Sequence, residues 1–191
     1  MGKFLLLIDC QNDFISGTLA VNGAKEIMDA AARYISKHGD EYDNILLTCD
    51  NHPFNHCSFK ENGGEWPSHC VKHSVGAAIY EPIMEELKRF RSDEKGKGVA
   101  FFKKGCDKNI EEYSFLRNTS NERVFQTICE ETNVEQIDIL GILSEYCVLS
   151  SIKDLVRLGY KDKLFIMEDF CPSIDDGSTL HQYLEENNIK H

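Results

Sequence analysis

Residues 4–9 read Phe-Leu-Leu-Leu-Ile-Asp, an apolar run of strand length that ends in an acid. Amphipathic stretches alternate with further apolar runs of this kind, at residues 45–49, 99–102, 136–140 and 164–167. Such alternation is typical of the α/β class, in which strands of a mainly parallel sheet are joined by helices. The sequence therefore predicts an α/β architecture with a mainly parallel central sheet.

The amphipathic stretches predict the helices. The first is expected from about Ala24 to Lys37, because apolar residues recur from Ile27 at three- and four-residue spacing and Gly39 follows. Further helices are expected at residues 83–89, 123–130, 147–158 and 177–186. The stretch 51–76 shows no clear periodicity, and a connection of that length in a compact domain is more often functional than idle.

Length and composition limit the class of protein. A chain of 191 residues fits one domain, residues 1–191, which can bury a core without disulfides. Its eight cysteines form no C-x-x-C pair, which argues against a zinc finger or a thioredoxin-like motif. Residues 1–3 lead straight into a strand with no signal-peptide pattern, so we expect a reducing cytoplasm. The net charge of −11 argues against nucleic acid or an anionic membrane surface as a partner, whereas a homo-oligomer is compatible with the sequence.

Reactive side chains stand where the predicted strands end: Asp9, Asp50, Lys104 and Cys147. The carboxyl ends of parallel strands converge on one crevice, so a carboxylate, an ammonium and a thiol are expected to share a pocket. This combination favours a cysteine hydrolase with a metal beside it. Other interpretations stay open at this point: Asp9 could be a turn residue, Lys103 competes with Lys104, and most free cysteines are buried and inert.

Cys147 has a special position among the cysteines. The segment Gly141–Val148 has the pattern of a strand end, a turn and the first turn of a helix. A helix N-terminus there would lower the pKa of the thiol and direct backbone N–H groups at a nearby oxyanion.

The long connection carries the pattern of a metal site. In Asp50-Asn51-His52 a carboxylate and an imidazole lie on the same side of an extended segment, and His69 in Trp66-Pro67-Ser68-His69 could complete one face. These ligands suit one divalent ion per chain; zinc is expected first, and iron and manganese accept the same ligands. His56 is either a fourth ligand or the partner of a bound water. The remaining histidines are interpreted as surface residues: His38, His73, His181 and His191.

Together these motifs resemble the nicotinamidases of the isochorismatase-like cysteine hydrolases. The resemblance runs from Leu6 to Asp176, and the joint order of its segments is more specific than any one of them. The matching segments are residues 8–14 (Ile-Asp-Cys-Gln-Asn-Asp-Phe), 50–53 (Asp-Asn-His-Pro), 66–71 (Trp-Pro-Ser-His-Cys-Val), 104–105 (Lys-Gly) and 141–148 (Gly-Ile-Leu-Ser-Glu-Tyr-Cys-Val).

The resemblance implies a fold and a catalytic triad. The fold is the isochorismatase-like hydrolase fold, a three-layer α/β/α arrangement around a mainly parallel sheet. Asp9 is implied as general base and acid, and Cys147 as the nucleophile. Lys104 is implied as their partner, because the family's lysine directly precedes a glycine, which favours it over Lys103.

The resemblance also implies the reaction, which is conversion of nicotinamide to nicotinate and ammonia through a cysteine thioester, in NAD salvage (pyridine nucleotide biosynthesis). The backbone N–H groups of Leu143 and Cys147 are implied as the oxyanion hole, with a cis peptide between Ile142 and Leu143. The resemblance implies that three protein ligands hold the metal and that the metal binds the pyridine nitrogen. Phe14 and Trp66 are implied to flank the ring. The implied metal ligands are Asp50, His52 and His69.

Two other functions remain open. The chain could be a related metal-containing amidase that acts on another small carboxamide, or a non-catalytic relative that binds a metabolite or a metal. The sequence departs from the usual family pattern at Ser144-Glu145, and again where Tyr113-Ser114 precedes Phe115, so we expect a reshaped pocket wall near Phe115.

Overall fold

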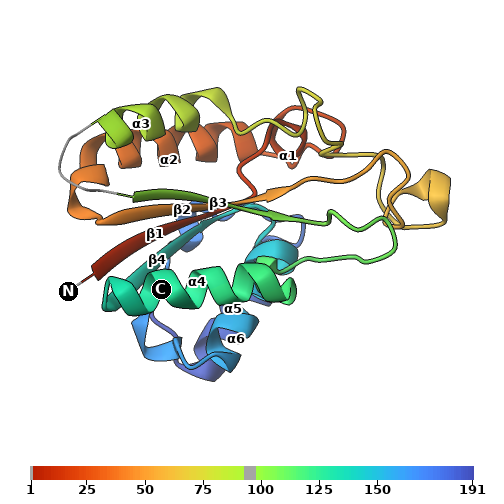
Figure 1. Cartoon of the computed structure of the whole chain (residues 1–191). Coiled ribbons are helices and arrows are strands. Elements are labelled where there is room, and N and C mark those ends of the chain that lie inside the picture. Colours follow the sequence, from red (N-terminus) through yellow and green to blue (C-terminus); the bar gives the residue numbers. More distant parts are fainter. Residues whose placement is uncertain (1, 93–97) are drawn as a thin grey trace.

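The sheet forms the centre of the molecule and is parallel throughout. The computed structural model describes residues 2–92 and 98–191 (Figure 1). Five strands lie in the order β3-β2-β1-β4-β5, and each neighbouring pair is parallel. They are β1 (Gly2–Ile8), β2 (Asn44–Asp50), β3 (Gly98–Lys104), β4 (Val134–Gly141) and β5 (Leu164–Ile166). The prediction of a mainly parallel sheet is confirmed, and all five predicted strands are present.

The helices also follow the predicted alternation. They are α1 (Asn12–Ile15), α2 (Ala24–His38), α3 (Glu81–Ser92), α4 (Thr119–Glu131), α5 (Leu149–Arg157) and α6 (Ser178–Asn187). The sequence did not predict the short α1. The prediction of one helix over residues 147–158 is wrong at its start, because Ser144–Val148 form a π-helical turn and α5 begins after it. In that turn the Val148 N–H donates to the Leu143 carbonyl at 3.0 Å, five residues back, a widening that recurs at functional sites.

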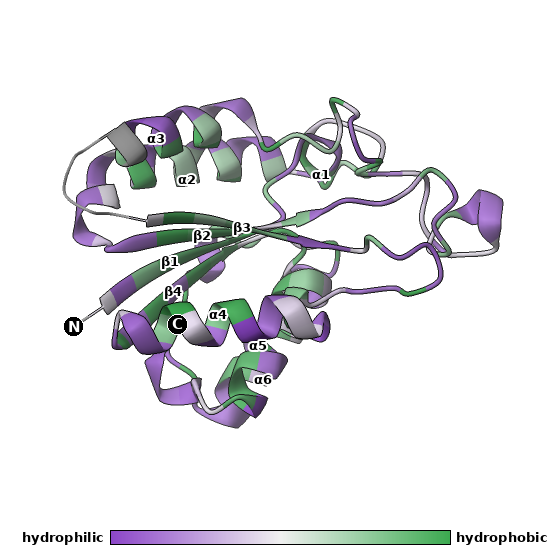
Figure 2. Cartoon of the chain, viewed as in Figure 1, coloured by the Kyte–Doolittle hydropathy of each residue, from purple (hydrophilic) through white to green (hydrophobic). Residues whose placement is uncertain are grey.

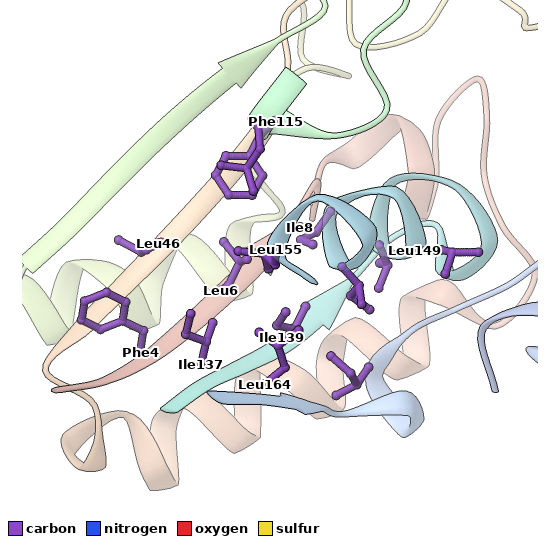
Figure 3. Packing of buried hydrophobic residues seen from close by; sticks show 14 of the residues in the cluster. Phe4, Leu6, Ile8, Leu46, Phe115, Ile137, Ile139, Leu149, Leu155 and Leu164 are labelled. Carbon is purple, nitrogen blue, oxygen red and sulfur yellow. The ribbon is translucent and has the colours of Figure 1, made fainter. Parts of the chain in front are cut away.

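Helices cover both faces of the sheet, which confirms the three-layer α/β/α prediction. Figure 1 shows α2 and α3 on one face and α4, α5 and α6 on the other. Successive side chains of a strand point to opposite faces, so Leu5 and Leu7 pack under α2 and α3 while Phe4, Leu6 and Ile8 pack against α4, α5 and α6. Figure 2 shows the apolar faces of the helices turned to the sheet. Figure 3 shows from close by the cluster that contains Phe4, Leu6 and Ile8. A strand covered on both sides needs the continuous apolar run found at residues 4–8.

The connection from β2 to α3 is irregular, as its lack of periodicity predicted. Between Asp50 and Glu81 the described chain contains one 3-10 turn, Lys60–Asn62, and isolated bridges. In Figure 1 this connection extends beyond the carboxyl ends of the strands. No helix within residues 2–92 and 98–191 combines the length and the apolar character needed to cross a membrane.

Candidate active site

Four neighbouring strands bring their carboxyl ends to one place. Asp9 follows β1, Asp50 ends β2, Lys104 ends β3, and Cys147 lies in the π-helical turn after β4. Asp50 and Lys104 are direct partners in the register of β2 and β3. All four residues are buried, so the sheet topology places a carboxylate pair, an ammonium and a thiol together away from water.

The Lys104 ammonium joins these groups. Its Nζ donates to Asp50 Oδ1 at 2.6 Å, lies 2.9 Å from Asp9 Oδ2 and lies 3.5 Å from Cys147 Sγ. The side chain is 1% exposed. Burial alone would lower the pKa of Lys104, but the charges of Asp50 and Asp9 hold it well above its ordinary value. The lysine is therefore a fixed positive charge, and the neighbouring Lys103 is exposed to solvent.

Asp9 is held by a hydroxyl and by an unusual backbone conformation. Its Oδ1 accepts a hydrogen bond from Thr48 Oγ1 at 2.6 Å, and its backbone takes a left-handed conformation with φ of 49°, which Asp tolerates better than most residues. Burial raises the pKa of the Asp9 carboxyl, and Lys104 and Thr48 offset only part of that rise. A carboxylate with a raised pKa is suited to accepting and returning a proton.

Burial favours the thiol form of Cys147. The prediction that a helix N-terminus lowers its pKa is wrong: burial raises the pKa well above the ordinary value, and the Lys104 charge offsets that only partly while Asp9 adds to it. The residue also lies within the π-helical turn and not in the first turn of α5. Nucleophilic attack by this sulfur therefore requires a base. Two carboxylates lie nearby, and Asp9 is the one that does not belong with His52 and His69, since Asp50 lies beside those two histidines.

The turn before Cys147 contains the predicted cis peptide between Ile142 and Leu143. The N–H groups on either side donate to backbone carbonyls, from Ile142 to Ile8 at 2.8 Å and from Ser144 to Pro172 at 3.0 Å. Among the described residues the Leu143 N–H has no such acceptor. A backbone donor without a protein partner beside a thiol is one element of an oxyanion hole.

Asp50, His52 and His69 form a cluster that could hold a metal ion. Their donor atoms lie within 4.8 Å of one another. His52 Nδ1 donates to the Gly105 carbonyl at 3.0 Å and His69 Nδ1 to the Pro67 carbonyl at 2.8 Å. A carbonyl accepts only, so these bonds place a hydrogen on Nδ1, and in the neutral ring each Nε2 presents a lone pair.

Both Nε2 atoms face Asp50. His52 Nε2 lies 3.6 Å and His69 Nε2 3.9 Å from Asp50 Oδ2, and the buried His52 Nε2 has no hydrogen-bond partner in the described chain. Burial would raise the pKa of Asp50, but Lys104 and His52 hold it below the ordinary range, so this ligand is charged. Two anchored imidazoles and a carboxylate around a buried, unsatisfied nitrogen fit a divalent transition metal.

Gly105 supports this cluster from behind. Its φ of +62° lies in the left-handed region, and a Cβ built there would overlap the His52 ring. Its N–H donates to Glu112 Oε2 at 2.8 Å while its carbonyl accepts from His52. The Lys104-Gly105 pair thus carries the ammonium and the imidazole support in two consecutive residues.

His56 is occupied by protein partners on both nitrogens. Its Nδ1 lies 2.7 Å from Ser58 Oγ and its Nε2 lies 3.0 Å from the Ile110 carbonyl. Its ring packs on His52 with centroids 4.1 Å apart. In this structure His56 therefore supports the His52 ring, and neither of its nitrogens is free for a metal.

Aromatic side chains form the wall of a small cavity beside Cys147. Trp66 Nε1 donates to the Tyr113 hydroxyl at 3.1 Å, and Tyr146 packs edge-on against Trp66 at 5.1 Å between centroids. The cavity measures about 20 Å³ and its other lining residues are Leu19, Asp50, His69, Glu111, Leu143 and Cys147. Phe14 packs on His69 with centroids 5.5 Å apart. Of the segment in which a reshaped wall was expected, Tyr113 lines the cavity, whereas the Phe115 ring is buried in the core between Phe102 and Phe125.

Two positioning residues were missed from the sequence. Thr48 orients Asp9, and Gln11 clamps the backbone of Asp50: its Nε2 donates to the Asp50 carbonyl and its Oε1 accepts from the Asp50 N–H, both at 2.8 Å. Gln11 lies inside the segment 8–14 that carries the resemblance, which was the available signal. Thr48 lies within the second strand, where no pattern distinguishes it from a packing residue.

Comparisons with known proteins identify the family of the chain. Residues 3–187 match the isochorismatase domain. The chain is 28% identical to a nicotinamidase of Escherichia coli over 96% of its own length and 90% of that protein. A pyrazinamidase of Pyrococcus horikoshii in complex with zinc has a TM-score of 0.81 at 27% identity, covering 100% of this chain and 98% of the other. The yeast nicotinamidase bound to the inhibitor nicotinaldehyde has a TM-score of 0.83 at 25% identity, covering 98% of each chain. The chain belongs to the isochorismatase family.

Proposed function

We propose that this chain is a nicotinamidase, which hydrolyses nicotinamide to nicotinate and ammonia through a thioester on Cys147. We also propose that it acts in NAD salvage and that residues 1–191 form one domain. The observation that carries the proposal is the position of Lys104, whose ammonium contacts Asp9, Asp50 and Cys147 together. One cation thus links the groups of acyl transfer to the metal-type cluster. The matched nicotinamidases of two organisms support the choice of substrate.

Acylation begins with proton transfer. Asp9 takes the proton of Cys147, whose raised pKa keeps it a thiol until then, and the Lys104 charge stabilises the thiolate that forms. The sulfur attacks the carboxamide carbon, and the N–H groups of Leu143 and Cys147 receive the negative charge that develops on the oxygen. Asp9 returns the proton to the leaving nitrogen, and ammonia departs.

Deacylation uses the same base. Asp9 removes a proton from a water molecule, which attacks the thioester carbon; the C–S bond then breaks and the proton returns to sulfur. The nicotinic acid that forms loses its proton to solvent and leaves as nicotinate, and Cys147 is again a thiol. One carboxylate can serve both halves because its raised pKa lets it accept a proton and release it again within each half.

Asp50, His52 and His69 are proposed to hold one divalent ion, with zinc as the first choice. Such an ion would supply a Lewis-acid position for the pyridine nitrogen and so orient the ring. The residues themselves fit this use, because the His52 Nε2 is buried without a partner. A relative solved with zinc supports the choice of metal.

Trp66 is proposed to flank the substrate ring, and Phe14 to support that ring through His69. The cavity of about 20 Å³ has room for roughly one water molecule, whereas ligand sites usually exceed 300 Å³. Nicotinamide can therefore bind only if the partly exposed side chains of the wall move. Trp66, Tyr113 and Tyr146 are the partly exposed aromatic members of that wall.

The test is ammonia release from matched amides. Wild-type chain with zinc supplied is expected to release ammonia from nicotinamide, and Cys147→Ala is expected to release none. Cys106→Ala, which changes an exposed thiol, is the control and is expected to keep the activity. Benzamide, which lacks the ring nitrogen, is expected to be a much poorer substrate than nicotinamide.

The other functions give different results. An amidase for another carboxamide would act on a different member of an amide panel, with the same dependence on Cys147. A non-catalytic relative would release no ammonia from any amide and would bind its ligand equally well as Cys147→Ala. A wild-type protein that is inactive on nicotinamide with metal present would refute the proposal. The reducing cytoplasm expected from the sequence is part of this proposal, and all eight cysteines are free thiols.

A further inference from the structure

A second group of imidazoles and carboxylates lies beside α6 and shares no residue with the active site. Glu168 follows β5, and His181 lies in the first turns of α6. His191 follows Lys190, which forms a parallel bridge with Phe165 of β5. Three separate segments therefore bring one donor atom each to within 4.8 Å of one another.

The hydrogen bonds of His191 leave one of its nitrogens facing negative charge. Its Nδ1 lies 2.9 Å from the Ile189 carbonyl and must donate there, because a carbonyl only accepts. Its Nε2 lies 3.5 Å from Glu168 Oε1 and 3.3 Å from Glu185 Oε1. In the neutral ring this nitrogen presents a lone pair to two carboxylates, which is unfavourable unless a cation lies between them.

The spacing of the donors fits a shared ion. Ligands about 2.0–2.2 Å from a tetrahedral zinc ion lie roughly 3.3–3.6 Å from one another. His181 Nδ1 lies 3.2 Å from Glu168 Oε2, and the two His191 contacts measure 3.5 and 3.3 Å. The His181 contacts with Glu168, at 3.2 and 3.4 Å, are long hydrogen bonds, since charge-assisted ones measure about 2.7–2.9 Å and the pair His38–Glu41 measures 2.6 Å.

The cluster is held by structure and reached by solvent. Ile189 beside it is buried, as are Leu180 and Leu184 on the inner face of α6, so the backbone around the donors is anchored. The His191 side chain is 20% exposed, and Glu168 lines two surface depressions, one shared with His191 and the other with His181. Ions and water can therefore approach the donors from outside.

We propose that Glu168, His181 and His191 bind a second divalent transition-metal ion of the zinc class, with Glu185 within reach as a fourth ligand. Two imidazoles with carboxylates are a zinc-type donor set. The His191 Nδ1–H bond to a backbone carbonyl is the same orienting contact that His52 and His69 make at the active site. Such an ion would join α6 to the edge of the sheet at β5.

The test counts zinc per chain after equilibrium dialysis against a low micromolar zinc buffer near neutral pH. The full wild-type chain is expected to hold one equivalent more than the double variant His181→Ala/His191→Ala. A second variant, Glu168→Gln, keeps the shape of the side chain and is expected to lose the same equivalent. His38→Ala removes a half-buried histidine beside a glutamate, outside the cluster, and is expected to match the wild type.

Equal zinc content in the wild type and the double variant would overturn the proposal and would leave protons as the cations between these side chains. A loss of zinc in His38→Ala as large as in the double variant would also overturn it. The measured quantity is a difference between variants, so it does not depend on whether the chain hydrolyses nicotinamide. A second readout is the Tm, which zinc is expected to raise more in the wild type than in the double variant.

Discussion

Replacing Lys104 by methionine would remove the buried ammonium between Asp9 and Asp50 and keep most of the side-chain volume. The Nζ lies 2.9 Å from one carboxylate and 2.6 Å from the other. At an effective dielectric constant near 20, each pair contributes roughly 6 kcal/mol of Coulomb attraction, much of which offsets the desolvation of the charges. Removing one partner of a buried pair typically costs about 3–5 kcal/mol, because the other charge stays buried without compensation.

The assay is urea unfolding of metal-free protein near neutral pH, since a metal ion would mask part of the loss. Lys104→Met is expected to lower the free energy of unfolding by about 3–5 kcal/mol. The matched control is Lys103→Met, one residue away on the same strand but exposed, for which we expect a change within about 0.5 kcal/mol. The same pair of variants separates the two lysines that the sequence alone left in competition.

The loss should also depend on pH. Without Lys104, burial and the Asp50 charge favour the protonated form of Asp9. The pKa of Asp9 in the folded variant therefore lies above its pKa in the unfolded chain. A group with a raised folded pKa contributes stability below the unfolded pKa and loses it as pH rises through the folded value. The deficit should therefore be larger near pH 8 than near pH 5. If Lys104→Met unfolds at the same urea concentration as Lys103→Met, the carboxylates are not held by this lysine and the reasoning is wrong.

Other substitutions test the support of the site. Thr48→Val removes the hydrogen bond that lowers the pKa of Asp9, so the acid limb of the kcat/KM profile should move to higher pH, and an unchanged profile would contradict the assigned base. Gly105→Ala places a Cβ against the His52 ring and should weaken zinc binding by about 10–100-fold in equilibrium dialysis; wild-type affinity would show that the ring position does not matter. Trp66→Phe removes the hydrogen bond to Tyr113 in the pocket wall, which is worth about 1 kcal/mol. We therefore expect the KM for nicotinamide to rise roughly fivefold while kcat changes little. An unchanged KM would show that the substrate does not contact Trp66.

The order of strands and helices was predictable because the periodicity of the chain is strong. The apolar run at residues 4–8 requires a strand buried on both faces, and helices cover both faces. What sequence could not give was the backbone after β4, where the apolar pattern continues from a π-helical turn into α5 without a break. A π-helix bonds residues five apart and an α-helix residues four apart. Apolar periodicity over only five residues cannot distinguish these two spacings.

The candidate site was predictable in its residues but not in its electrostatics. The sequence pattern of a helix start suggested a low pKa for Cys147, whereas burial raises it. Burial depends on side chains that arrive from other segments, among them Lys104, and no local pattern reports it. The same holds for His56, whose two nitrogens are occupied by Ser58 and Ile110, the latter 54 residues along the chain.

The irregular connection after β2 keeps its shape because the chain after β1 satisfies its backbone. A loop without regular structure cannot pair its main-chain polar groups within a helix or a sheet, so side chains from other segments hold it in place. Three consecutive side chains supply them: Gln11 binds the Ala77 carbonyl at 2.8 Å, Asn12 the Val75 carbonyl at 2.9 Å, and Asp13 accepts from the Cys70 N–H at 2.7 Å. Cys70 follows His69, so residues 11–13 hold the loop that carries this proposed metal ligand. Asp9, the proposed base, lies two residues before Gln11 in the same segment. The proposed base and the loop that carries His69 are therefore both tied to one short stretch of chain.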